Sequence, residues 1–113
     1  MPINVLIVEP NSLVRETVSQ MVSLSGCLPI AVCDYPQAIG ALSSIKVELL
    51  ITGIGEDNDH VFSLANQAKK MQPSIKIVTS TRFKNLGFAE ASAFVSVPFS
   101  PSDLRMAIQR ALG

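Results

Sequence analysis

Short apolar runs alternate with amphipathic stretches along the whole chain. The apolar runs are rich in β-branched residues, which is typical of strands covered on both faces. Between them, apolar residues recur at helical spacing, and glycine or proline follows several of the stretches. Strands are predicted at 3–8, 30–33, 47–52, 75–79 and 93–97. Helices are predicted over 14–25, 36–42, 61–68 and 104–111, with a short or irregular one within 80–90.

Alternating strands and helices predict an α/β fold. Consecutive parallel strands need right-handed helical crossovers, so we expect a parallel sheet with helices on both faces. No linker, repeat or low-complexity segment interrupts the pattern, and 113 residues suit one domain spanning 1–113. Hydrophobic residues make up 48% and charged residues 16%, which fits buried strands or surface patches that await a partner.

Charge and cysteine usage narrow the possible classes of protein. The formal net charge is zero, so nothing indicates direct contact with nucleic acid. The start of the chain lacks the pattern of a leader peptide, and no stretch is long enough to span a bilayer. If 28–33 is a strand, Cys27 and Cys33 lie roughly 20 Å apart, too far for a disulfide. We therefore expect free thiols and a cytoplasmic protein.

Five segments, in order and at near-correct spacing, resemble the receiver domain of the bacterial response-regulator family. The resemblance covers essentially the whole chain. It implies a doubly wound, flavodoxin-like fold with five parallel strands in the order 2-1-3-4-5. It also suggests the N-terminal domain of a longer regulator. The matching segments are Val5–Asn11 with Leu13–Glu16, Glu48–Gly53, Thr79–Ser80, Val97–Phe99 and Leu104–Leu112.

The resemblance also assigns the positions that bear the family's phosphoryl chemistry. That chemistry needs an aspartate nucleophile, an acidic pair for Mg²⁺, a hydroxyl and a lysine. Those positions hold, in turn, Gly53, the pair Glu9 and Pro10, Thr79, and Val97. Three of the five groups are missing. We therefore expect no aspartyl phosphorylation, weak or absent Mg²⁺ binding, no other metal or cofactor, and no enzymatic activity.

Neighbouring carboxylates do not replace the missing nucleophile in this interpretation. Glu48 begins the third predicted strand, about 16 Å from its other end at ~3.3 Å per residue. Asp57 belongs to the polar loop 56–59, which we interpret as solvated. Without a phosphoryl group, Thr79 is expected to hydrogen-bond locally at a strand end. His60 is interpreted as an exposed structural residue.

In the family, the fourth helix, fifth strand and last helix form the face that binds partners. On that basis we expect Phe83, Leu86, Phe94 and Met106 to contribute to a partner face, with Phe83 partly exposed. Phe94 has two interpretations of equal weight, as the aromatic that reports activation or as a packed aromatic on an outer strand. The Val97–Pro98 bond is expected to be cis, because the corresponding bond usually is in the family.

The leading hypothesis is an atypical receiver domain, a pseudo-receiver, that signals by protein–protein contact. Expected partners are a histidine kinase, an output domain or another regulator, with homodimerisation through the same face as an alternative. The second hypothesis is a regulatory module that binds a small molecule in an uncharged pocket beside Gly53, Gly55 and Thr79. A flavodoxin-like enzyme is disfavoured, because no nucleophile–base pair or phosphate-binding loop occurs.

Overall fold

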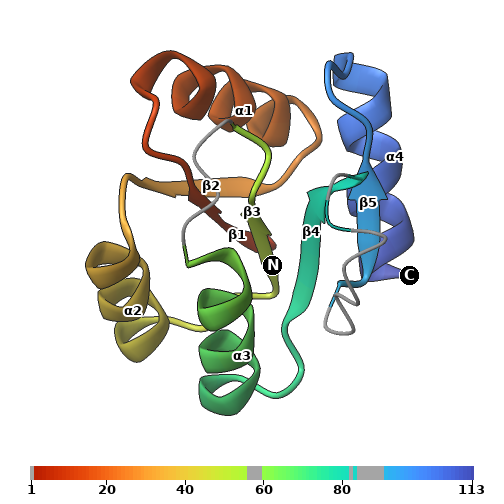
Figure 1. Cartoon of the computed structure of the whole chain (residues 1–113). Coiled ribbons are helices and arrows are strands. Elements are labelled where there is room, and N and C mark those ends of the chain that lie inside the picture. The colour runs from red at the N-terminus through yellow and green to blue at the C-terminus, as the bar shows by residue number, and fades with distance from the viewer. Residues whose placement is uncertain (1, 56–59, 82, 84–90) are drawn as a thin grey trace.

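The computed structural model describes residues 2–55, 60–81, 83 and 91–113, and has five parallel strands with helices on both sides (Figure 1). The sheet order is β2-β1-β3-β4-β5, which confirms the predicted topology. The strands are β1 (Asn4–Val8), β2 (Leu28–Val32), β3 (Leu49–Thr52), β4 (Lys76–Ser80) and β5 (Ala93–Val95). The helices are α1 (Ser12–Leu24), α2 (Tyr35–Ser44), α3 (Val61–Met71) and α4 (Pro101–Leu112).

The predicted strands and helices agree with these bounds to within about three residues at most ends. The strand predicted at 30–33 begins earlier, at Leu28. The short helix predicted within 80–90 falls mostly outside the described residues. Within the described part of the chain, no helix has the length and apolar character needed to cross a membrane.

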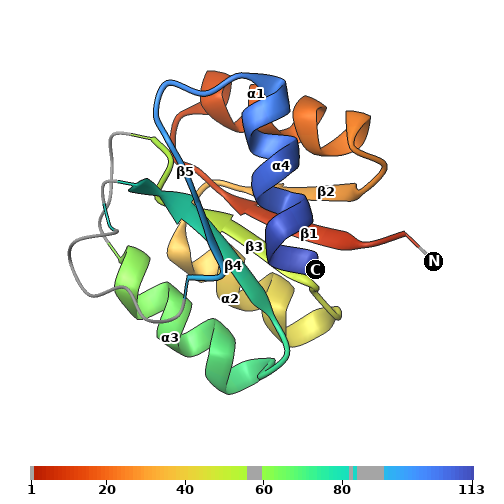
Figure 2. The same ribbon diagram turned by 90° about the vertical axis from the view of Figure 1, so that its right-hand side faces the viewer.

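Side chains of β1 alternate between two hydrophobic cores, one on each face of the sheet. Val5 and Ile7 pack beneath α1 and α4, whereas Leu6 and Val8 pack against α2 and α3. Figure 2 shows these two helix pairs on opposite sides of the sheet. The continuous apolar runs in the sequence therefore reflect burial on both faces.

Polar residues set the starts of three helices. Asn11 caps α1 by accepting hydrogen bonds from the amides of Leu13 and Val14. Asp34 caps α2 by accepting from Gln37 N. Ser100 and Asp103 form a reciprocal capping box at the start of α4. Such caps satisfy amides that have no partner within the helix, which fixes where each helix begins.

The register of the sheet brings the residues after β1 and β3 together. Val8 pairs with Val32 on one side and with Thr52 on the other. Glu9 and Gly53 therefore follow the carboxyl ends of two neighbouring strands, which is where doubly wound folds place their binding sites. Glu48 lies at the opposite edge, as expected, and accepts a hydrogen bond from Asn4 N at 2.6 Å.

Candidate functional site

Gly53 directly follows β3 and has a backbone conformation and a surrounding space that suit only glycine. Its φ is +73°, in the left-handed region that side chains rarely adopt. A Cβ at this position would lie 2.6 Å from Thr79 Oγ1 and 2.9 Å from Phe83 Cε2. Val61 Cγ1 would be 3.2 Å away. The position that the resemblance assigns to the phosphoryl acceptor is therefore filled by its neighbours.

Phe83 is the main residue that fills this space. Its side chain is 4% exposed and belongs to the core beneath α2 and α3. Its ring meets the Phe62 ring edge-on, with centroids 5.6 Å apart and an interplanar angle of 74°. The prediction that Phe83 is partly exposed was wrong, because the missing side chain at Gly53 leaves room for the ring.

Glu9 is a buried carboxylate that supports the loops. It is 2% exposed, and it accepts a hydrogen bond from Asn11 N at 2.9 Å. Its carboxylate packs directly against Gly55, where a Cβ would collide with both carboxylate oxygens. Arg15 Nη1 donates to the Glu9 carbonyl at 2.8 Å, which holds the same turn from the other side. Glu9 therefore ties the loop after β1 to the loop after β3.

This arrangement does not fit the Mg²⁺ site that the receiver fold implies. Mg²⁺ prefers several hard oxygen ligands in near-octahedral geometry. The Glu9 carboxylate already accepts a hydrogen bond from the Asn11 amide, while Pro10 and Gly53 supply no side-chain oxygen. Among the described residues, no three His, Cys, Asp or Glu side chains come together as a metal site. The loop residues 56–59 lie outside that part of the chain.

Thr79 is fully buried, and its hydroxyl has no hydrogen-bond partner among the described residues. The expectation of a local hydrogen bond was therefore wrong. The hydroxyl oxygen would lie 2.6 Å from a Cβ at position 53, where glycine supplies no side-chain acceptor. A buried hydroxyl without a partner is costly.

Val97 and Pro98 complete the positions assigned by the resemblance. Val97 is 45% exposed and brings no charge to the site. The Val97–Pro98 peptide bond is cis. Nearby, Phe94 is half-buried and Met106 is 48% exposed. These two side chains line a shallow hollow between β5 and α4 together with Asp103 and Arg110. Leu86, the remaining predicted member of the partner face, lies outside the described residues.

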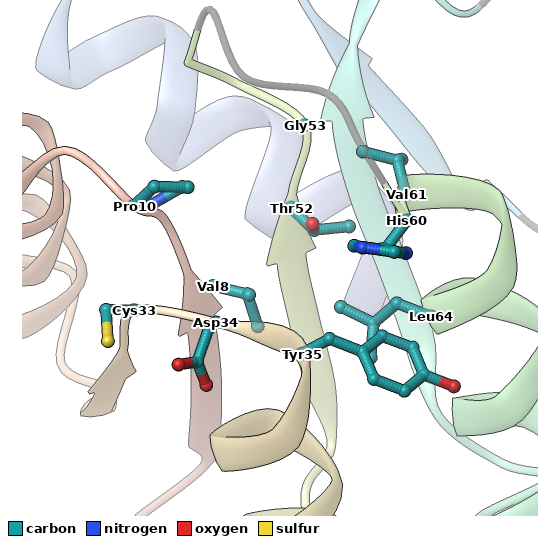
Figure 3. A pocket seen from close by; sticks show the side chains of 10 residues that line it. All are labelled: Val8, Pro10, Cys33, Asp34, Tyr35, Thr52, Gly53, His60, Val61 and Leu64. Carbon is teal, nitrogen blue, oxygen red and sulfur yellow. The ribbon is translucent and has the colours of Figure 1, made fainter.

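A cavity of about 230 Å³ opens beside Gly53, but on the side of α2 and α3 (Figure 3). The second hypothesis placed an uncharged pocket beside Gly53, Gly55 and Thr79. Of these three, only Gly53 lines the cavity. The Phe83 ring fills the side of Gly53 that faces Thr79, and Gly55 packs against the Glu9 carboxylate.

Sequence reasoning missed the contribution of His60 to this cavity. His60 is exposed, as expected, but it lies on the lining, and its ring centroid is 5.6 Å from that of Tyr35. The one available signal was its position immediately before the apolar periodicity of α3. That signal fixes the start of a helix and says nothing about where the ring points.

Comparisons with solved structures agree with this architecture. In contrast, no protein-family model and no curated protein matches the chain. A receiver domain protein (CheY-like) from Methanospirillum hungatei JF-1 aligns with a TM-score of 0.84 at 20% identity, over 99% of this chain and 94% of that one. The chemotaxis protein CheY4 of Vibrio cholerae aligns with a TM-score of 0.83 at 21% identity, over 99% of this chain and all (100%) of that one.

A response regulator receiver protein from Sinorhizobium medicae WSM419 aligns almost as widely. Its TM-score is 0.83 at 19% identity, over 98% of this chain and 94% of that chain. Similarity at these identities establishes the fold and leaves the chemistry of individual side chains to be argued from the structure. The chain has the CheY-like fold of response-regulator receiver domains.

Proposed function

We propose that this domain is a pseudo-receiver that acts in bacterial two-component signalling without aspartyl phosphorylation. The observation that carries the proposal is the closed space at Gly53. A phosphoryl acceptor needs a carboxylate there, with room for the incoming group. Instead, Phe83 Cε2 and Thr79 Oγ1 would both lie under 3 Å from a Cβ. Together with Pro10 and Val97, this supports a receiver fold kept for binding rather than phosphoryl transfer.

The surface of β5 and α4 is the contact surface in this proposal. Val97 and Met106 are exposed there, and Phe94 is half-buried. Asp103 and Arg110 line the same hollow as Phe94 and Met106. Apolar groups bordered by charges are typical of protein interfaces. The partner is a histidine kinase, an output domain or another regulator, or a second copy of this chain. The domain works in the cytoplasm.

Nuclear magnetic resonance with beryllofluoride and Mg²⁺ tests the loss of phosphoryl chemistry. Beryllofluoride mimics a phosphoryl group only where an aspartate and Mg²⁺ hold it. We expect no saturable shift of the Glu9, Gly53 or Thr79 amides, while a receiver domain with all five groups shifts under the same conditions. Saturable shifts at these amides that disappear in Glu9→Gln would contradict the proposal.

Sedimentation velocity tests whether the same surface joins two copies. Met106→Glu places a charge on the apolar part of the contact surface, and we expect it to abolish any concentration-dependent dimer. Leu24→Glu is the matched control, because Leu24 is 84% exposed on α1, away from this surface. A dimer that survives Met106→Glu but is lost in Leu24→Glu would place the interface elsewhere.

The small-molecule hypothesis keeps one specific observation in its favour, the cavity beside α2 and α3. The lining of this cavity differs from that of the pocket expected from the sequence, because it includes Gly53 but neither Gly55 nor Thr79.

A further inference from the structure

The cavity lies at the point in the sheet where the winding of the chain reverses. Val8 and Pro10 line it from the end of β1, and Thr52 and Gly53 line it from the end of β3. From β1 the chain winds to β2 on one side, then returns to β3 on the other. In doubly wound sheets, ligands bind in the crevice at this switch point. The location alone therefore favours a binding site.

Two aromatic rings from different segments form one wall of the cavity. Tyr35 is the first residue of α2, and His60 directly precedes α3. Their ring centroids are 5.6 Å apart, and the rings are tilted by 51°. Figure 3 shows both on the same side of the cavity, facing Pro10 across it. Aromatic faces exposed in a cavity favour a flat ligand that stacks on them.

His60 is held in an unusual backbone conformation. Its φ is +70°, and it is the only residue other than glycine with positive φ among those described. Such conformations persist where the surrounding structure maintains them, often at ligand sites. This conformation directs the imidazole over the cavity and against Tyr35 (Figure 3).

Thr52 supplies a hydroxyl to the lining. Its side chain is 3% exposed and lines the cavity. Figure 3 shows Thr52 and His60 among the side chains that line the cavity. A hydroxyl both donates and accepts, so it pairs with a ring nitrogen or a carbonyl oxygen. A ligand bound here therefore has a hydroxyl within the lining with which to form a hydrogen bond.

Charge on the lining argues against an anionic ligand. Among the described residues, neither lysine nor arginine lines the cavity. Asp34 does line it, but its carboxylate accepts from Gln37 N at 2.9 Å and points away from Thr52 and His60 (Figure 3). A phosphate or carboxylate would find no cation here, so a neutral ligand fits better.

The volume limits the size of the ligand. An apolar cavity of about 150 Å³ accepts benzene. The cavity here, at about 230 Å³ and open to solvent, therefore has room for one or two fused rings. We propose that it binds a neutral, planar heteroaromatic molecule such as a free nucleobase. The ligand stacks on the His60 ring and meets the tilted Tyr35 ring nearer to edge-on, and a ring nitrogen or carbonyl pairs with Thr52.

Titration of the ¹⁵N-labelled protein with adenine tests this site. We expect saturable amide shifts confined to Tyr35, Thr52, Gly53 and His60 and their sequence neighbours. Cyclohexanol, a saturated ring with a hydroxyl, should bind several-fold more weakly, because it cannot stack. Inorganic phosphate should produce no saturable shift. Absence of a saturable adenine shift up to the solubility limit, or equal binding of cyclohexanol, would overturn the proposal.

Two variants separate the stacking from the hydrogen bond. His60→Gly removes the ring and suits the positive φ, so the backbone is retained; we expect adenine to bind about fivefold more weakly or worse. Thr52→Val keeps the shape and removes the hydroxyl, which should weaken binding about threefold to tenfold. Leu24→Ala, on exposed α1 surface, should leave affinity unchanged. Unchanged affinity in both cavity variants would overturn the proposal.

The proposed ligand site and the proposed loss of phosphorylation can fail separately. Absence of adenine binding would not affect the interpretation of the beryllofluoride experiment, and phosphorylation of the protein would not affect the interpretation of the adenine titration.

Discussion

At the scale of single residues, the decisive feature is a group of contacts around Gly53. Thr79, Phe83 and Val61 occupy the space that a side chain would need, and the backbone adopts a φ of +73°. A side chain at position 53 would therefore be disfavoured both by the close neighbours and by the positive φ. Replacing Gly53 with aspartate would therefore strain the fold before it supplied a nucleophile.

Three glycine-to-alanine variants separate the cost of the positive φ from the cost of the close packing. Gly53→Ala combines a positive φ with overpacking, and we expect it to lower the free energy of unfolding by about 2–4 kcal/mol. Gly26→Ala has the positive φ but open space, so about 1 kcal/mol should be lost. Gly40→Ala, in open space on α2, should gain about 0.5–1 kcal/mol. Urea denaturation measures all three.

A loss at Gly53 no larger than the loss at Gly26 would contradict the close packing of Phe83 and Thr79. It would then be the backbone alone that requires glycine.

Cys27 offers a second prediction at this scale. Burial, with a smaller contribution from Glu48, raises the pKa of its thiol. Because the thiolate is the reactive form, alkylation of Cys27 by iodoacetamide at pH 8 should be slower in the folded protein than in urea. Glu48→Gln should speed it, whereas Glu16→Gln, on exposed α1 surface, should not. A rate unaffected by Glu48→Gln would contradict the contribution of that carboxylate.

The raised pKa also affects stability at high pH. The unfolded thiol ionises first, so the contribution of Cys27 to stability is fully present below its ordinary pKa. It is lost as the pH rises through the folded pKa.

The assigned positions were partly predictable from residue types. The sequence alone shows that Gly53, Pro10 and Val97 lack the groups of the family. It does not show that Phe83 fills the resulting space, because 81–90 has no clear apolar period and contains Gly87. The unpaired hydroxyl of Thr79 follows from that packing, so it was equally out of reach.

At the scale of helices and strands, hydrophobic periodicity made most of the fold predictable. Continuous apolar runs predict the strands, and apolar residues at helical spacing predict the helices. The contacts of Gln72 were not predictable: its side chain accepts from Val47 N and donates to the carbonyls of Leu42 and Ile45. These bonds span 25 to 30 residues, and no local pattern encodes them.

The capping box of α4 gives a prediction at this scale. Ser100 Oγ accepts from Asp103 N at 3.1 Å, and Asp103 Oδ2 accepts from Ser100 N at 2.9 Å. Ser100→Ala should lower the free energy of unfolding by about 1 kcal/mol. Ser102→Ala, inside the same exposed turn, should change it by less than about half that. Equal effects in urea denaturation would show that the cap adds nothing specific.

At the scale of the whole molecule, the chain has a receiver fold, but the groups around Gly53 differ from those that phosphoryl transfer requires. The two cores and the strand order hold β1, β3 and β4 in place without help from phosphoryl chemistry. The side of Gly53 facing Thr79 is filled by Phe83, while the side facing α2 and α3 opens into a cavity. We infer that the domain acts through ligand binding at the cavity and protein contact at the surface of β5 and α4, and not through phosphoryl transfer at Gly53.

The most direct test of the central claim is the intact mass of the protein after incubation with acetyl phosphate and Mg²⁺. A receiver domain that has all five groups serves as the positive control. The account predicts no gain of a phosphoryl mass in the wild-type protein, and none in Gly53→Asp, which still lacks the second acidic group and the lysine. A stoichiometric gain in the wild-type protein would contradict it.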